Sequence, residues 1–281
     1  MLANKTFSFY KYLLLLLVTS ALISACARAP VTGRQQLLLI SESQAIQQSE
    51  SAYLKMLEKP SGDGKLDSDL KLKARVENIT GRIITEAIRF RPETASWKWS
   101  IHVIDDPKVA NAWAMAGGRM ALYSGLVKKI KPTDDELAQV LGHEIAHALA
   151  KHTAEKMSVA LATNLTIAAF AITQKNENAL ALQGVSLAAA LAINLPNSRT
   201  AETEADRIGI ELAARAGYNP KAAVSLWKKM AKVGGGGQGF EFLSTHPATN
   251  NRINTLNNLI QQMMPYYKTE AQHPVYKFKH Q

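Results

Sequence analysis

The sequence predicts a mainly α-helical fold with a small β-sheet, that is, an α+β class. Long segments with apolar residues at helical spacing predict the helices, and capping boxes mark where some of them begin. Alternating polar and apolar residues, typical of strands, are concentrated between residues 97 and 127. The chain has 281 residues, of which 47% are hydrophobic, and this is enough apolar material for the core of one good-sized domain.

The N-terminus has the layout of a bacterial export signal. Lys5 and Lys11 precede the apolar run LLLLLVTSALI, which is shorter than the about 20 apolar residues that a membrane span needs. Small residues then end at Cys26, the only cysteine, so a disulfide framework is excluded. The segment ISAC resembles a lipobox, in which the cysteine becomes the acylated first residue; the alternative is an ordinary secretory signal. We therefore expect a lipoprotein signal peptide over residues 1–25, and Ala27 after the cysteine favours the outer membrane.

The charge of the chain limits its partners. The formal net charge is +10, and the basic residues are scattered rather than grouped. No aromatic platform motif accompanies them, and an exported chain does not meet the genome, so we expect no nucleic-acid partner. A solvated basic surface that lies against anionic lipid headgroups is the simpler interpretation.

The first part of the mature chain predicts an extended lead-in and two helices. Residues 30–40 are expected to be extended. Ser41 and Gln44 then form a capping box for a helix that ends at about Glu58. The segment PSGDGK predicts a loop, and helical spacing of apolar residues predicts a second helix over residues 67–89.

Strand patterns follow this second helix. Trp97, Trp99, Ile101 and Val103 alternate with polar residues and predict a half-buried strand. The stretch NAWAMAGGRMALYSGLV predicts two short strands joined at the Gly117-Gly118 pair, which is most simply a hairpin turn.

The next helix carries the sequence LGHEIAH. Thr133 and Glu136 form a second capping box, and acidic residues in the first turn favour the helix dipole. His143 and His147 are four residues apart, so both imidazoles lie on one face of the helix and can share one metal ion. The sequence therefore predicts a metal-binding helix.

Two neighbours of this histidine pair have different expected roles. Glu144 flanks the pair and can accept a proton from a water at the metal, the role of a general base. His152 is nine residues beyond His143, about half a turn around the same helix, and is expected to be a surface or packing histidine.

A second acidic helix offers a third ligand. In the segment SRTAETEAD, Glu202 and Asp206 share one helix face, whereas Glu204 points nearly the other way. One glutamate would bind the metal, and a carboxylate one turn later would orient a ligand imidazole. Spacing alone leaves the choice between Glu202 and Glu204 open, and an acidic, solvated first turn is the alternative interpretation.

These motifs together resemble a known family. HEIAH, ETEAD, NAWAMAGG and STHPATNNRI occur in the order found in HtpX/Oma-type zinc metallopeptidases, gluzincins related to the CAAX prenyl proteases. The resemblance spans about residues 30–265. PVTGRQQL after the lipobox is similar to the periplasmic lipoprotein branch, which includes LoiP, YcaL and the protease core of BepA. The resemblance implies a zincin-like domain and one zinc ion per chain.

The resemblance also implies roles for single residues. Glu202 matches the third ligand of the family, and Asp206 matches the carboxylate one turn later. Asn111 matches a motif residue on an edge strand that pairs with the substrate backbone. Ala116 stands where the family often has proline, which puts the local turn geometry in question.

His246, in STHP, matches a family histidine near the metal, and two roles remain open for it. It either stabilises the tetrahedral oxyanion together with Asn111 or occupies the open metal position as a reversible off-switch. A loop histidine without a role at the metal is the third interpretation.

The resemblance implies a membrane-anchored zinc endopeptidase that hydrolyses unfolded or misassembled envelope proteins in quality control. Glu144 would serve as general base. The expected location is the periplasmic face of the outer membrane, held by lipid at Cys26, with the outer-membrane protein assembly machinery as a candidate partner. The alternative is a non-catalytic, metal-stabilised lipoprotein that acts as a chaperone or assembly partner.

The remaining segments complete the domain organisation. Residues 26–60 are expected to form a tether and helix, residues 61–266 the zinc metallopeptidase domain, and residues 267–281 a flexible basic tail. Within the domain, residues 158–195 are apolar and interrupted by QKNEN. Two buried or cleft-lining helices are expected there, with membrane contact or a lid over the zinc as alternatives.

Overall fold

The computed structural model describes residues 26–173, 197–234, 240–246, 252–268 and 270–279. Its first elements are the antiparallel strands β1 (Cys26–Arg28) and β2 (Gln35–Leu37), which form a short hairpin. Helix α2 (Glu42–Gly62) follows, with the predicted capping box between Ser41 and Gln44.

Helix α2 is longer than predicted, and the expected loop at PSGDGK is wrong for its first residues. The helix continues through Pro60 to Gly62. A proline in the last turn costs one intrahelical hydrogen bond, because it has no N–H. The turn is still closed, because the Asp63 N–H donates to the carbonyl of Lys59 at 3.0 Å and the Lys65 N–H donates to that of Pro60 at 2.8 Å.

The small β-sheet has three strands in the order β3-β5-β4. Strand β3 (Ser100–Ile104) pairs in parallel with β5 (Arg119–Tyr123), and β4 (Ala112–Met115) pairs antiparallel with β5 at the edge of the sheet. Gly117 and Gly118 have φ angles of 81° and 78°, so the predicted hairpin turn is confirmed.

Two boundaries differ from the sequence predictions. Strand β3 begins at Ser100 instead of Trp97, because residues 92–96 form a 3-10 helix that the Trp97 N–H closes by donating to the carbonyl of Thr94 at 3.0 Å. The expected strand at SGLV is wrong: Ser124–Ile130 is helix α4, which buries Leu126 and Ile130 one turn apart.

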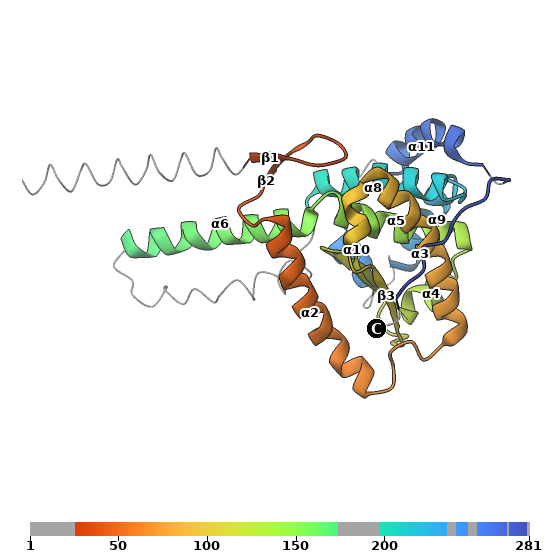
Figure 1. The fold of residues 1–281 in the computed structure, drawn as a ribbon, viewed down its shortest axis with the longest axis horizontal. Helices are drawn as coiled ribbons and strands as arrows, with labels where there is room; N and C mark the ends of the chain where they lie inside the picture. The colour runs from red at the N-terminus through yellow and green to blue at the C-terminus, as the bar shows by residue number, and fades with distance from the viewer. Residues whose placement is uncertain (1–25, 174–196, 235–239, 247–251, 269, 280–281) are drawn as a thin grey trace, which may run out of the picture.

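Three helices form the centre of the molecule (Figure 1). Helix α5 (Asp134–Leu149) packs against α3 (Leu70–Phe90), α8 (Arg199–Arg215) and strand β4. Its predicted capping box between Thr133 and Glu136 is present. Helices α5 and α8 approach closely because Gly142 and Gly209 face each other. A Cβ atom on Gly209 would lie 2.7 Å from the backbone nitrogen of His143.

The other elements surround this centre. They are the 3-10 helices η1 (Pro92–Ser96) and η3 (Met264–Tyr266) and the helices α9 (Ala222–Gly234), α10 (Glu241–Thr245) and α11 (Arg252–Met263). One buried apolar cluster connects α3, α5, α8, α9 and α11. Most of the described elements are helices and a three-stranded sheet packs with them, so the expected α+β class with mostly helical structure is confirmed.

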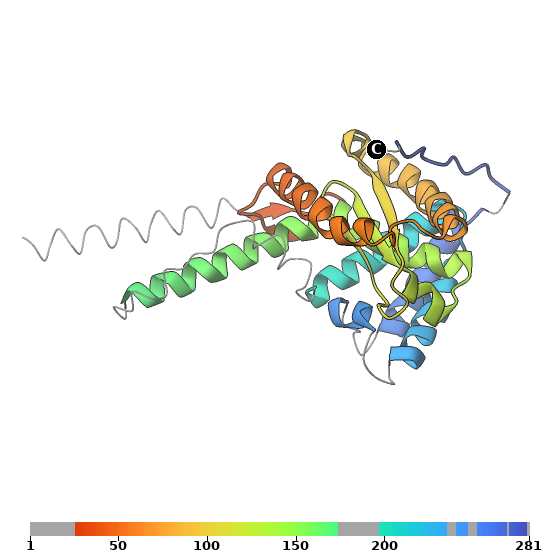
Figure 2. The same ribbon diagram turned by 90° about the horizontal axis from the view of Figure 1, so that it is seen from below.

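Helix α6 (His152–Thr173) extends away from this body, as Figures 1 and 2 show. It contains the first half of the apolar stretch for which two helices were expected, whereas residues 174–196 lie outside the described part of the chain. No helix among the described residues is long and apolar enough to cross a membrane.

The C-terminal segment lies against α3. The Tyr276 N–H donates to the carbonyl of Gly81 at 3.0 Å, and the rings of Tyr276 and Phe278 pack on the main apolar cluster. The segment thus contacts the domain at these residues, and the flexibility of residues 267–281 stays a prediction.

Candidate metal centre

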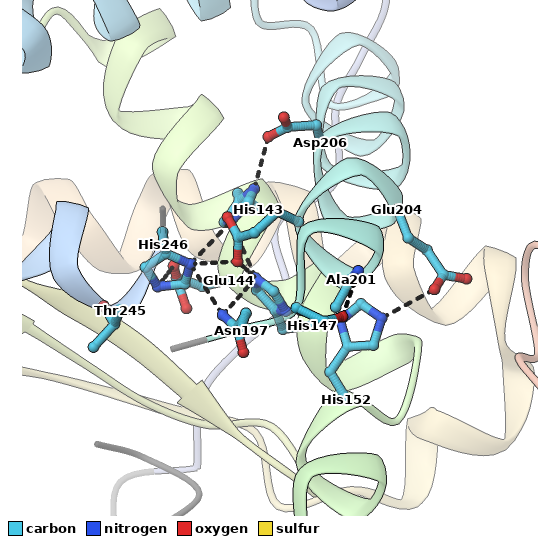
Figure 3. A network of polar contacts seen from close by, with 12 residues as sticks. His143, Glu144, His147, His152, Asn197, Ala201, Glu204, Asp206, Thr245 and His246 are labelled. Carbon is cyan, nitrogen blue, oxygen red and sulfur yellow. Dashed lines mark hydrogen bonds and ion pairs between the residues drawn. The ribbon is translucent and has the colours of Figure 1, made fainter. Parts of the chain in front are cut away.

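Four buried side chains converge between α5 and α8 (Figure 3). One ligand atom each from His143, His147, Glu202 and His246 can be chosen so that all lie within 4.8 Å of one another. The two Nε2 atoms of His143 and His147 are 3.0 Å apart, and the Glu202 carboxylate oxygens lie 3.4 and 3.3 Å from them. The structure thus brings together the three ligands expected from the sequence and adds His246.

These donors fit one zinc ion. Zn–N and Zn–O distances are about 2.0–2.2 Å, so donors around a single ion lie about 3–4 Å apart, as these do. Two imidazoles and a carboxylate are also a donor set that suits zinc. Burial lowers the pKa of His147, which favours the neutral imidazole that a metal needs. Burial also lowers the pKa of His143, but the carboxylates of Glu202 and Asp206 raise it to about 9, so a proton competes with a metal there.

A carboxylate contacts His143, and an arginine holds that carboxylate in place. The Asp206 Oδ1 atom is 3.0 Å from His143 Nδ1, the position expected for an orienting carboxylate. Arg252, only 3% exposed, donates to this oxygen at 2.6 Å and to Glu202 Oε2 at 3.2 Å. The side chain of Arg252 comes from the start of α11, within the NNRI motif.

Glu144 lies beside the metal cluster, and its two oxygens have different surroundings. Its Oε2 atom accepts a hydrogen bond from the Ala114 N–H of strand β4 at 3.2 Å, whereas Oε1 has no hydrogen-bond partner among the described residues. Burial raises the pKa of Glu144, although His246 and His143 lower it in part. A raised pKa makes a carboxylate a stronger base, which suits proton transfer.

Glu144 faces a cavity of about 440 Å³ between the edge strand and the helices. Asn111 and Trp113 line it from the β4 side, and Lys156 lines it from α6. Burial lowers the pKa of Lys156 to about 8. The Asn111 Oδ1 atom accepts from the Ala112 N–H at 2.9 Å, so this side chain shapes the start of the edge strand.

His246 occupies the gap between the metal cluster and Glu144. Its Nδ1 atom lies 3.0 Å from Glu202 Oε1 and 3.2 Å from His143 Nε2, and its Nε2 atom lies 3.4 Å from Glu144 Oε1. The ring stacks on Phe242 with centroids 4.4 Å apart, and it is 4% exposed. It is therefore not a loop histidine remote from the metal.

His152 is not a surface residue, so that part of its prediction is wrong. Helix α5 ends at Leu149, and Lys151 has a left-handed φ of 59°, so His152 begins a new helix. Its ring is 2% exposed and returns to His147, with the two Nδ1 atoms 2.7 Å apart. The sequence carries no signal for this break, because a lysine, not a glycine, adopts the left-handed conformation.

Glu204 lies outside the metal cluster, as the resemblance implied by matching Glu202 to the third ligand. Its carboxylate accepts hydrogen bonds from His152, Thr32 and Arg34. Burial raises the pKa of Glu204, but these hydrogen bonds outweigh it and lower the pKa to about 2. Asn197 was also not foreseen, and its amide nitrogen lies 3.2 Å from His246 Nδ1.

Comparison with known proteins agrees with this geometry. The family model for peptidase family M48 matches residues 71–260. The chain is 32% identical to the mitochondrial metalloendopeptidase OMA1 of Saccharomyces cerevisiae over 253 residues, which is 86% of this chain and 71% of the relative. It is 33% identical to metalloprotease LoiP of Escherichia coli K12 over 145 residues, 52% of this chain and 56% of LoiP.

A protein of Vibrio cholerae described as a beta-barrel assembly-enhancing protease is 28% identical over 225 residues, 76% of this chain and 44% of the relative. The chain thus spans about half the length of these two bacterial relatives. The family match covers most of the chain and includes the helices that carry His143, His147 and Glu202. The chain therefore belongs to peptidase family M48 and to the class of the metalloendopeptidases.

Proposed function

We propose that this protein is a zinc-dependent endopeptidase that cuts unfolded or misassembled proteins of the bacterial envelope. The observation that carries the proposal is the buried carboxylate of Glu144, which faces the cavity beside the zinc ligands and has one oxygen, Oε1, without a hydrogen bond among the described residues. A purely structural zinc site needs no such base. The proposed ligands are His143, His147 and Glu202, with Asp206 orienting His143.

The side chains divide the reaction between them. When bound, zinc supplies a Lewis acid that polarises the scissile carbonyl and makes water more acidic. Glu144 accepts the proton of the attacking water and returns it to the leaving amine. The Ala114 N–H donates to Glu144 Oε2 and so fixes the direction in which Oε1 points.

The edge strand supports an extended peptide as the substrate. The Asn111 carbonyl accepts from the Tyr123 N–H at 3.0 Å, so residues 111, 113 and 115 make the hydrogen bonds to β5. The carbonyl groups of Ala112 and Ala114 consequently point away from β5, toward the open edge, whereas their N–H groups already donate to Asn111 Oδ1 and Glu144 Oε2. A peptide that adds a strand there must be extended, which favours unfolded segments over folded domains.

For His246 we favour the role of reversible off-switch over that of oxyanion stabiliser. The support is the position of Nδ1 among the zinc ligands, where it takes the fourth place that a water would need. No hydrogen bond joins His246 to Asn111 among the described residues. Replacing His246 with Ala should leave zinc binding intact and increase turnover; a loss of turnover would support the oxyanion role.

The location and partners extend the proposal. Acylation of Cys26 and release to the outer membrane rest on the lipobox and on Ala27. A periplasmic role rests on the resemblance of PVTGRQQL after the lipobox to the periplasmic lipoprotein branch, and a link to outer-membrane protein assembly is supported by the similarity to the assembly-enhancing protease. The mitochondrial relative instead supports only the enzyme class.

The test compares the full-length wild type with Glu144→Gln. Both should bind about one zinc per chain, and the variant should cleave casein about 100- to 10,000-fold more slowly, because general-base catalysis contributes that much. If both bind zinc and neither cuts, even with His246 replaced, a non-catalytic chaperone or assembly partner is the better explanation. If wild type holds no metal, the proposed function is wrong.

A further inference from the structure

A line of polar contacts runs behind His147, away from the proposed reaction. The Nδ1 atoms of His147 and His152 are 2.7 Å apart, and His152 Nε2 is 3.0 Å from Glu204 Oε2 (Figure 3). All three side chains are buried, with exposed fractions of 6% or less. The contacts join a zinc ligand on α5 to a carboxylate on α8 through the first residue of α6.

Metal binding would set the direction of the hydrogen bond between the Nδ1 atoms of His147 and His152. When Nε2 of His147 binds the metal, its remaining proton is on Nδ1, so Nδ1 must donate to Nδ1 of His152. His152 then accepts at Nδ1 and donates from Nε2 to Glu204.

The two imidazole ligands are thus supported in related ways. His143 has a carboxylate of α8 directly behind it, Asp206, at 3.0 Å. Behind His147, His152 lies between the imidazole and the carboxylate and transmits the hydrogen bond to Glu204. Each ligand imidazole therefore ends on an α8 carboxylate, which fixes its ring and increases its basicity.

Glu204 is in turn held by the N-terminal hairpin. The Thr32 hydroxyl donates to its Oε1, and the Arg34 Nε donates to its Oε2 at 2.6 Å. The other guanidinium nitrogens of Arg34 donate to both oxygens of Glu155 on α6, at 2.8 and 2.6 Å. Arg34 therefore clamps α8 and α6 together at the base of the line of contacts.

We propose that His152 and Glu204 are positioning residues for the zinc ligand His147, and that Arg34 and Thr32 of the β1–β2 hairpin hold Glu204 in place. This inference rests on the proposed zinc site. It adds that the segment directly after Cys26 takes part in zinc affinity, although none of its residues is a proposed ligand or lines the cavity.

The test measures zinc affinity by chelator competition in the full-length protein. His152→Phe, which keeps a ring of similar shape, should weaken zinc binding about 10- to 100-fold, as is usual when a partner of a metal-ligating histidine is lost. His152→Gln should restore most of the affinity, because its amide can accept from His147 and donate to Glu204. Arg34→Met should give a smaller loss in the same direction. His273→Phe, on the C-terminal segment, is the matched control and should change nothing.

Equal zinc affinity of wild type and His152→Phe overturns the proposal, and so does failure of His152→Gln to improve on His152→Phe. Unchanged affinity of Arg34→Met overturns the part assigned to the hairpin. If His152→Phe does not fold, Glu204→Gln decides: it keeps the shape of the side chain, and unchanged affinity again overturns the proposal.

The cobalt-substituted protein gives a second readout, because the visible spectrum should change in His152→Phe and not in His273→Phe. The proposed function is tested separately by Glu144→Gln, which should bind zinc like wild type. If Glu144→Gln still cleaves casein, the proposed function fails while the result for His152 stands.

Discussion

Arg252 is expected to contribute more to the stability of the protein than the exposed arginine pairs of the described residues do. It donates to Glu202 and Asp206, and the exposed fractions of the three side chains are 3%, 1% and 6%. Its guanidinium also lies 3.6 Å from the centroid of the Trp227 ring. Replacing Arg252 with Met keeps much of the apolar packing and removes the positive charge.

The magnitude follows from what remains after the substitution. Two buried carboxylates lose a charged partner, and removing one side of a buried ion pair costs about 3–5 kcal/mol in the free energy of unfolding. For a chain of this size, 1 kcal/mol corresponds to about 2–4 °C in Tm. The metal-free Arg252→Met protein should therefore melt about 6–20 °C below wild type. Bound zinc should reduce this difference, since it supplies positive charge to Glu202.

Thermal unfolding followed by circular dichroism in chelator measures the effect. The matched control is Arg215→Met, because Arg215 also pairs with a glutamate and lies over an aromatic ring, at 2.8 Å from Glu211 and 3.8 Å from the Tyr266 centroid. Its side chain is 34% exposed, so the pair is worth about 0–1 kcal/mol. If Arg252→Met melts no lower than Arg215→Met, the reasoning about the buried pair is refuted.

Three further predictions follow from the same geometry. Gly209→Ala should destabilise the protein by about 1–3 kcal/mol and weaken zinc binding, because the new methyl group would push α8 away from α5. The control is Gly62→Ala, whose methyl group meets open space. Equal free energies of unfolding of the two variants in denaturant would contradict this prediction. Glu136→Gln should cost about 1–3 kcal/mol at neutral pH, since the variant loses the ion pair with Lys229. Burial raises the pKa of Glu136, but Lys229 and the capping hydrogen bond lower it overall, so this stabilisation is present above the unfolded pKa of about 4.3 and disappears as pH falls through the folded pKa; a difference from wild type that persists in acid would exclude this origin. Removing zinc with a chelator should lower both Tm and the free energy of unfolding. The free energy should fall by about 4 kcal/mol if zinc had been present at 1,000 times its Kd, and restored zinc should reverse the change.

Local chemistry made much of this fold predictable. The capping boxes at Ser41 and Thr133 state where helices begin, and the structure has both. Helical spacing placed His143 and His147 on one face without any knowledge of neighbours. The glycine pair at 117–118 marked the hairpin because both residues have positive φ.

Long-range packing accounts for what the sequence did not predict. The parallel pairing of β3 with β5 joins segments that the β4 hairpin separates, and no local pattern specifies it. Arg252 reaches the metal centre only because α11 packs on α8, and Arg34 reaches Glu204 across 170 residues of sequence. Such partners are fixed by the folded arrangement, not by spacing.

The acidic stretch of α8 shows where spacing and folding divide the work. Residues two apart on a helix differ by about 200° and residues four apart by about 40°, which separates Glu204 from the Glu202 and Asp206 face. That rule separates the two glutamates without saying which of them binds the metal, and the metal cluster contains Glu202. The other face is not left to solvent, because the break at Lys151 brings His152 around to the side that Glu204 faces. The choice between the two glutamates is therefore a division of roles: Glu202 lies among the ligand atoms, and Glu204 supports a ligand from the opposite face of the same helix.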